Sequence, residues 1–162
     1  MIPFTFSKTV EVLVTEDGIK DVAEAVLGSI SDQIRAKEPK SCTNEQSQIL
    51  FSGGPFSVPN PRWNVLGMIT KGKIDVMRSR NKLVISYKLW YTELLILASL
   101  ATASVAYILI FSLGIRSVWM SAVAWLGFYL VNYIISIARF DGLMHSALNK
   151  LDTIVYSASG RD

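Results

Sequence analysis

The sequence is poor in the residues that build covalent and metal-bound frameworks. Its 162 residues include one cysteine, Cys42, and one histidine, His145. A single cysteine cannot form an internal disulfide, and this pair cannot supply the four ligands of a structural zinc or iron–sulfur site. Cys42 lies in a polar stretch and His145 follows the apolar segments, so nothing in the sequence joins them as nucleophile and base. We therefore expect a non-enzymatic protein with no metal centre and no cofactor.

Charge is almost absent from nearly a third of the chain. Residues 89–138 contain one acidic and one basic side chain, Glu93 and Arg116, whereas about a quarter of the residues of a soluble domain are charged. Two charge-free runs, 94–113 and 118–138, lie within this region. Each would form a helix about 30 Å long, which matches the hydrocarbon core of a bilayer. Because only four residues separate the runs, the sequence predicts a two-helix transmembrane hairpin.

A soluble core with two buried apolar helices is the alternative interpretation. It is disfavoured because the rest of a 162-residue chain is too short to cover both helices. The first residues lack a basic stretch followed by an apolar one, so we expect no cleavable signal peptide. No Asn is followed two residues later by Ser or Thr, so no glycosylation acceptor indicates an extracellular face. We expect an integral protein of a bacterial inner membrane.

Basic residues are concentrated just before the first apolar run. Residues 70–88 hold six basic side chains and one acidic one, whereas the loop between the two runs holds only Arg116. This asymmetry places both termini in the cytoplasm, and adjacent aromatic residues are typical of the membrane interface. A nucleic-acid surface would show more charge and more aromatic residues, so we expect no nucleic-acid partner. The predicted contacts with anionic headgroups are Lys71, Lys73, Arg78, Arg80, Lys82, Lys88, Trp90 and Tyr91.

Residues 1–88 predict a small cytoplasmic α+β domain. Apolar residues alternate with polar ones at the N-terminus, as in Phe6, Val10 and Val12, which is typical of a half-buried strand. Helical spacing follows from Ile19 and should end near Lys37, ahead of Pro39. After a polar loop at 40–48, four strand-like runs complete the order β-α-β-β-β-β; they cover residues 49–52, 65–70, 73–77 and 83–89.

Residues 139–162 predict a separate amphipathic helix and tail. The polar face of this helix carries both signs of charge, whereas a helix lying on a membrane surface usually has a cationic face. We therefore favour docking on the sheet or on a partner. The expected class is an α+β membrane protein with three parts: the domain 1–88, the hairpin 89–138 and the C-terminal segment 139–162.

Two further groups of residues are candidate contacts. Small and polar residues in the apolar runs allow close helix packing, either within the hairpin or with another membrane protein or a second copy of the chain; they are Ala98, Thr102, Ala106, Gly127 and Asn132. Arg62 and Trp63 lie in a proline-rich loop. They suit a partner contact, although Trp63 folding back over the sheet is equally compatible with the sequence.

The absence of a catalytic constellation and the presence of an anchor favour an accessory or scaffolding subunit that presents a small cytoplasmic domain at an anionic lipid bilayer. Two alternatives stay open. One is a homo-oligomeric channel or membrane-perturbing effector, which the small residues and Asn132 would serve. The other is a membrane-anchored ligand or lipid sensor that uses the sheet.

Overall fold

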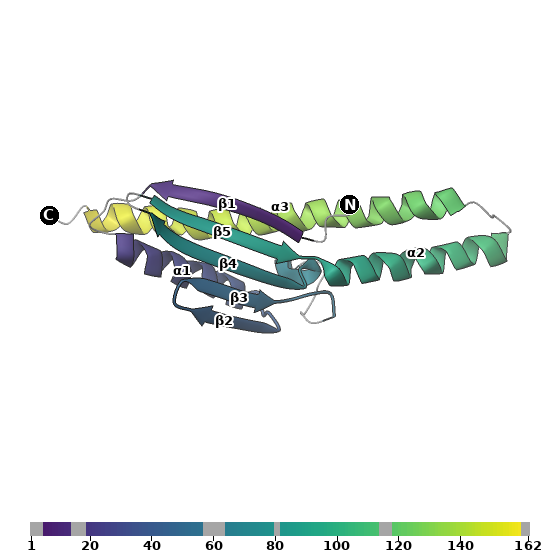
Figure 1. Ribbon diagram of the computed structural model, residues 1–162, viewed down its shortest axis with the longest axis horizontal. Coiled ribbons are helices and arrows are strands. Elements are labelled where there is room, and N and C mark those ends of the chain that lie inside the picture. The colour runs from purple at the N-terminus through teal and green to yellow at the C-terminus, as the bar shows by residue number, and fades with distance from the viewer. Residues whose placement is uncertain (1–4, 14–18, 57–63, 80–81, 114–117, 160–162) are drawn as a thin grey trace.

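The computed structural model describes residues 5–13, 19–56, 64–79, 82–113 and 118–159 (Figure 1). Their elements form one antiparallel sheet with strand order β1-β5-β4-β3-β2, together with three α-helices and a short 3-10 helix. The predicted α+β class is confirmed. In chain order the elements are β1 (Thr5–Leu13), α1 (Ile19–Arg35), β2 (Ser41–Glu45), β3 (Gln48–Ser52), η2 (Val65–Met68), β4 (Lys71–Ser79), β5 (Lys82–Trp90), α2 (Thr92–Leu113) and α3 (Val118–Ser159).

The sheet has one apolar and one polar face. Along β5, Leu83, Ile85 and Tyr87 are buried, while Lys82 and Lys88 alternate with them on the opposite side. We call the apolar face the inner face and the polar face the outer face. Helices α1 and α3 lie behind the sheet in Figure 1 and contact each other. They cover the inner face, so the core is a single layer between the sheet and two helices.

Helix α1 follows the predicted pattern. It buries one apolar stripe that includes Val26, Ile30 and Ile34, and full burial of each such side chain stabilises the fold by about 1.5–3 kcal/mol. The helix ends at Arg35, two residues before the expected position. Glu38 then takes a positive φ of 51° ahead of Pro39, which reverses the chain towards β2.

Two short elements differ from the prediction. Residues 65–68 form the helix η2 instead of a strand, because the Asn64 side chain caps the Leu66 N–H at 2.9 Å and Leu66 and Ile69 are both fully buried at a spacing of three residues. The expected polar loop contains β2, an edge strand paired with β3. One predicted strand is thus lost and another gained.

One uninterrupted helix of 42 residues, α3, continues across the predicted boundary at residue 138. No proline follows to break it, and its second half packs on the inner face of the sheet. There Phe140, Leu143, Met144 and Ala147 lie at helical spacing and are buried. The expectation that this segment docks on the sheet agrees with these contacts.

Helices α2 and α3 lie side by side beyond the end of the sheet (Figure 1). Within the described residues, only α3 is long and apolar enough to cross a membrane, over Trp119–Asn149; the apolar part of α2, Thr92–Ile108, is shorter. The predicted hairpin of two membrane spans is therefore not supported. One helix of this kind is weak evidence for membrane association, and part of it packs on the sheet.

Candidate membrane-contact site

Apolar side chains cover the parts of α2 and α3 that extend beyond the sheet, residues 96–110 and 119–135, which we call the projecting helices. Of the eighteen exposed large hydrophobic side chains in the described residues, fifteen belong to them. Such a contiguous exposed apolar surface marks a membrane or protein contact. The fifteen are Ile96, Leu100, Val105, Tyr107, Ile108, Ile110, Trp119, Met120, Val123, Leu126, Phe128, Leu130, Val131, Ile134 and Ile135.

Aromatic rings hold the two projecting helices together. Trp125, Tyr129 and Tyr133 follow one another at a spacing of four on α3, and each successive pair of rings is stacked with centroids 5.8 Å apart. Trp125 Nε1 donates to Ser99 Oγ of α2 at 3.2 Å, and Tyr133 meets Tyr91 edge-on at 4.8 Å. Because the rings occupy the contact between the helices, the aliphatic side chains face outwards.

The predicted packing residues separate into two groups. Ala98 is fully buried and Thr102 and Ala106 are partly buried, so the small residues of α2 serve packing within the chain. Gly127 is exposed, and a Cβ added there would meet nothing within 4 Å. Asn132 Nδ2 donates to the Phe128 carbonyl oxygen at 2.7 Å, which satisfies the amide within its own helix.

The structure does not gather the basic residues into one cluster. Lys71 pairs with Trp90 at the end of the sheet that leads into α2, whereas Ser79 pairs with Lys82 at the opposite end. Arg78 therefore lies about 24 Å from Lys71 along β4. Lys82 forms an ion pair with Glu11 at 2.9 Å on the outer face. Of the predicted basic contacts that the structure describes, only Lys71, Lys73 and Lys88 lie at the end of the sheet near the projecting helices.

The aromatic pair before α2 is also divided. Trp90 is half-buried on the outer face, and Lys88 Nζ lies 5.3 Å from its ring centroid. Tyr91 is fully buried against Tyr133, so it cannot contact a membrane surface as predicted. The predicted residues Arg62, Trp63 and Arg80 lie outside the described residues.

A close backbone approach fixes the start of α2. Gly54 has a φ of 106°, and a Cβ added there would overlap the Glu93 carboxylate. The Glu93 N–H donates to Thr70 Oγ1 at 2.8 Å, so the first turn of α2 is capped from the segment before β4. Beside this junction lies a pocket of about 490 Å³ lined by Thr70, Lys71, Trp90 and Thr92.

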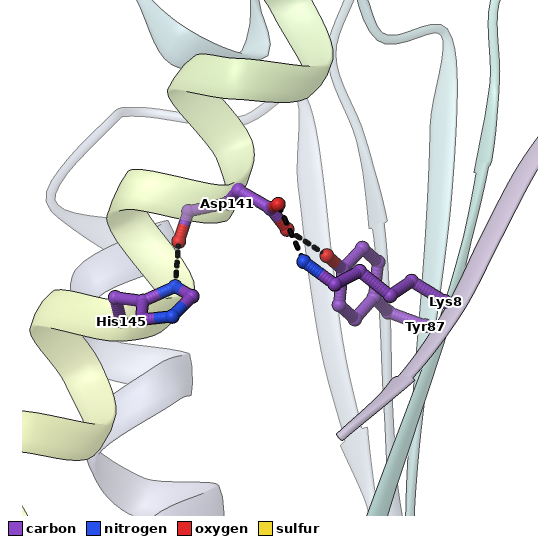
Figure 2. Close-up of polar contacts among 4 residues, drawn as sticks. All are labelled: Lys8, Tyr87, Asp141 and His145. Atoms are coloured by element: carbon purple, nitrogen blue, oxygen red, sulfur yellow. Dashed lines mark hydrogen bonds and ion pairs between the residues drawn. The ribbon is translucent and has the colours of Figure 1, made fainter.

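A polar cluster that the sequence did not predict joins α3 to the sheet (Figure 2). Lys8 Nζ of β1 lies 2.6 Å from Asp141 Oδ2, and the Tyr87 hydroxyl of β5 donates to Asp141 Oδ1. His145 Nδ1 lies 3.0 Å from the Asp141 carbonyl oxygen. Since Lys8 and Tyr87 are paired across β1 and β5, one carboxylate on α3 holds two neighbouring strands.

The charges in this cluster support one another. Burial on its own raises the pKa of Asp141, but the hydrogen bonds from Lys8 and Tyr87 outweigh it and lower the pKa below its usual value. Burial and the adjacent Asp141 carboxylate raise the pKa of Tyr87 well above its usual value. Asp141 is therefore ionised and Tyr87 neutral at pH 7. Lys8, Tyr87 and Asp141 each have a partner within the cluster, so the cluster attaches α3 to the sheet.

The sequence of β1 contains a feature from which this cluster could have been predicted. Phe6, Val10 and Val12 lie on the inner face, and Lys8 falls on the same face between them. A charge at an inward position needs a partner across the core, and Asp141 is that partner.

Within the described residues, no group of three or more His, Cys, Asp or Glu side chains is placed to hold a metal ion. Comparisons with protein families, with curated proteins and with solved structures find no match for this chain.

Proposed function

We propose that the protein is a non-enzymatic, membrane-anchored accessory or scaffolding subunit. The projecting helices enter the bilayer side by side from the cytoplasmic surface of a bacterial inner membrane, without both having to cross it, and the sheet and both chain termini lie on that side. The outer face of the sheet, which none of the described helices covers, is then presented to a partner. The uncovered apolar surface of the projecting helices is the observation that supports this proposal.

The energetics favour lipid as the surroundings of this surface. Twelve of its fifteen side chains are Leu, Ile, Val or Phe. At about −0.3 to −0.6 kcal/mol each on the insertion scale, they contribute about −4 to −7 kcal/mol. The same side chains facing water would promote aggregation. The polar outer face of the sheet begins directly beside the projecting helices, as expected for a protein that crosses from headgroups into water.

A charge placed on the projecting helices tests this anchor. Val123→Asp introduces a carboxylate at a side chain that is 68% exposed, and we expect loss from the carbonate-resistant membrane fraction, because a charge within the bilayer costs about 2.5–3.5 kcal/mol. Met77→Asp is the matched control, since Met77 is 60% exposed on the outer face. Both variants should stay folded in detergent. Equal membrane retention of the two variants would contradict the anchor.

Self-association of the projecting helices, as in a homo-oligomeric channel, is a second candidate. It is favoured by Gly127, where the backbone of α3 is exposed and open to close approach by a second helix. Gly127→Leu would weaken such an assembly without affecting the fold. The mass of the detergent-solubilised particle measures this, and a monomeric wild-type particle would exclude it.

A further inference from the structure

We propose that the outer face of the sheet, at the junction of β4 and β5 with α2, binds the phosphate group of an anionic phospholipid. The inference rests on the proposed function, because only a chain seated in a bilayer brings headgroups to this level. It goes further in assigning a particular site with a particular chemistry, in place of a general attraction between basic residues and the membrane.

Unneutralised lysines are the first observation. The strand register places Lys73 directly opposite Lys88, and Lys71 opposite Trp90. Like charges at opposed positions destabilise an antiparallel pair. Asp75 neutralises Lys73 at 3.0 Å, but among the described residues neither Lys71 nor Lys88 has a carboxylate partner. The junction therefore carries two excess positive charges on adjacent strands, which an anion would neutralise.

The junction pocket supplies the remaining groups. Its volume of about 490 Å³ falls within the range of about 300–1,000 Å³ that is typical of small-molecule sites. Lys71 lines the pocket, and Trp90, which also lines it, holds the Lys88 amine at 5.3 Å from its ring. Thr70 Oγ1 accepts from the Glu93 N–H and keeps its own hydrogen to donate. Two ammonium groups and a hydroxyl suit the oxygens of a phosphodiester.

An apolar track that leaves the pocket favours a lipid over free phosphate. Thr92 lines the pocket, and Ile96 and Leu100 follow it at a spacing of four on α2. Residues at this spacing lie on one face of a helix. Ile96 is 48% exposed and Leu100 59% exposed. A phospholipid whose phosphate group occupies the pocket would thus place an acyl chain along Ile96 and Leu100, with its glycerol against the Trp90 ring.

Lipid binding by the full-length protein in mild detergent tests the site by native mass spectrometry. We expect phosphatidylglycerol to bind more tightly than phosphatidylcholine. Lys71→Gln should weaken phosphatidylglycerol binding about fivefold, since a lysine near the membrane surface contributes about 1 kcal/mol. Arg78→Gln is the matched control, because Arg78 is exposed on the same strand at the far end of the sheet; we expect a change of less than about twofold.

Three results would overturn the site: equal affinity for the two lipids, equal effects of Lys71→Gln and Arg78→Gln, or displacement of the lipid by glycerol 3-phosphate at the same concentration, which would assign the pocket to a free phosphate ester. Carbonate extraction from phosphatidylcholine vesicles is measured in parallel. Extraction of the wild-type chain would contradict the proposed function. Retention of the chain together with no lipid preference would contradict only the proposed site.

Discussion

The two halves of α3 belong to the same helix but have different surroundings. Phe140 and Met144, over the sheet, are almost completely buried, whereas Val123 and Val131, beyond it, are 68% and 56% exposed. Each half packs one stripe inside the molecule. The halves differ on the side that faces away from the sheet and α2, where the sheet half exposes Arg139 and His145 and the projecting half exposes aliphatic residues.

This difference shows that the outward side of a helix, rather than its total hydrophobicity, distinguishes a half with a solvated polar side from a half that is apolar all round. A hydrophobicity averaged over α3 combines one half that has a polar outward side with one half that does not. The apolar stretch Trp119–Asn149 extends across both halves, so its length alone does not define the part that the sheet leaves uncovered.

The largest expected effect comes from removing a ring in the sheet half. Phe140 is fully buried and stacks on Phe51 with ring centroids 5.8 Å apart, with Tyr87 at 5.4 Å. Phe140→Ala should lower the free energy of unfolding in mild detergent by about 3–5 kcal/mol. Phe128→Ala removes the same ring from a 40% exposed position on the projecting half, and we expect a loss below about 1 kcal/mol. Similar losses would contradict the division of α3.

A smaller effect is expected at the attachment of α3 to β1. Asp141→Asn leaves the Lys8 ammonium without its counter-charge, and we expect a loss of about 1–2 kcal/mol, because Lys8 and Asp141 are part-buried. Glu11→Gln makes the same change in the exposed pair with Lys82 and should cost less than about 0.5 kcal/mol. Lys8→Met combined with Asp141→Asn should recover part of the loss. Additive costs of the two changes would show that the pair is not coupled.

The smallest effect is a pH dependence. Because the pKa of Tyr87 is higher in the folded chain than in the unfolded one, its contribution is complete below about pH 10 and is lost as the pH rises above that value. The folded chain retains the proton there and the unfolded chain releases it, at up to about 1.4 kcal/mol per pH unit. When the pH rises from 9 to 11, the free energy of unfolding should fall less for Tyr87→Phe than for the wild-type chain, as measured by unfolding in mild detergent. Parallel pH profiles would rule out this contribution.

The elements with a clear hydrophobic period were predictable. The alternation in β1, the helical stripe of α1 and the hairpin of β4 and β5 all appear at the expected places, because each buries one regular face. Strand β2 has no such face, since its residues Ser41–Glu45 are polar and it pairs at the sheet edge through its backbone. Residues 65–70 are apolar enough for a strand, but the Asn64 cap and the burial of Leu66 and Ile69 at helical spacing favour η2.

For the candidate site, the sequence predicted the types of residue involved but not their positions in the fold. The sequence indicated basic and aromatic residues before an apolar helix, but distance along the chain does not indicate which end of a strand a residue occupies. The hairpin register moves Arg78 and Lys82 to the far end, and helix packing buries Tyr91. The charged residues near 139 suggested the end of a span, yet no proline accompanies them, so α3 continues through Arg139 and Asp141.

Because α3 is continuous, a tilt at one end of the helix also displaces its other end. At 1.5 Å per residue its 42 residues are about 63 Å long. A tilt of about 10° around one end of the helix displaces the other end by about 11 Å. The Lys8–Asp141 ion pair and the stacking of Phe140 on Phe51 connect this helix to β1 and β3. In the membrane-anchored arrangement proposed above, any tilt of α3 would thus reposition the polar outer face of the sheet relative to a molecule bound there.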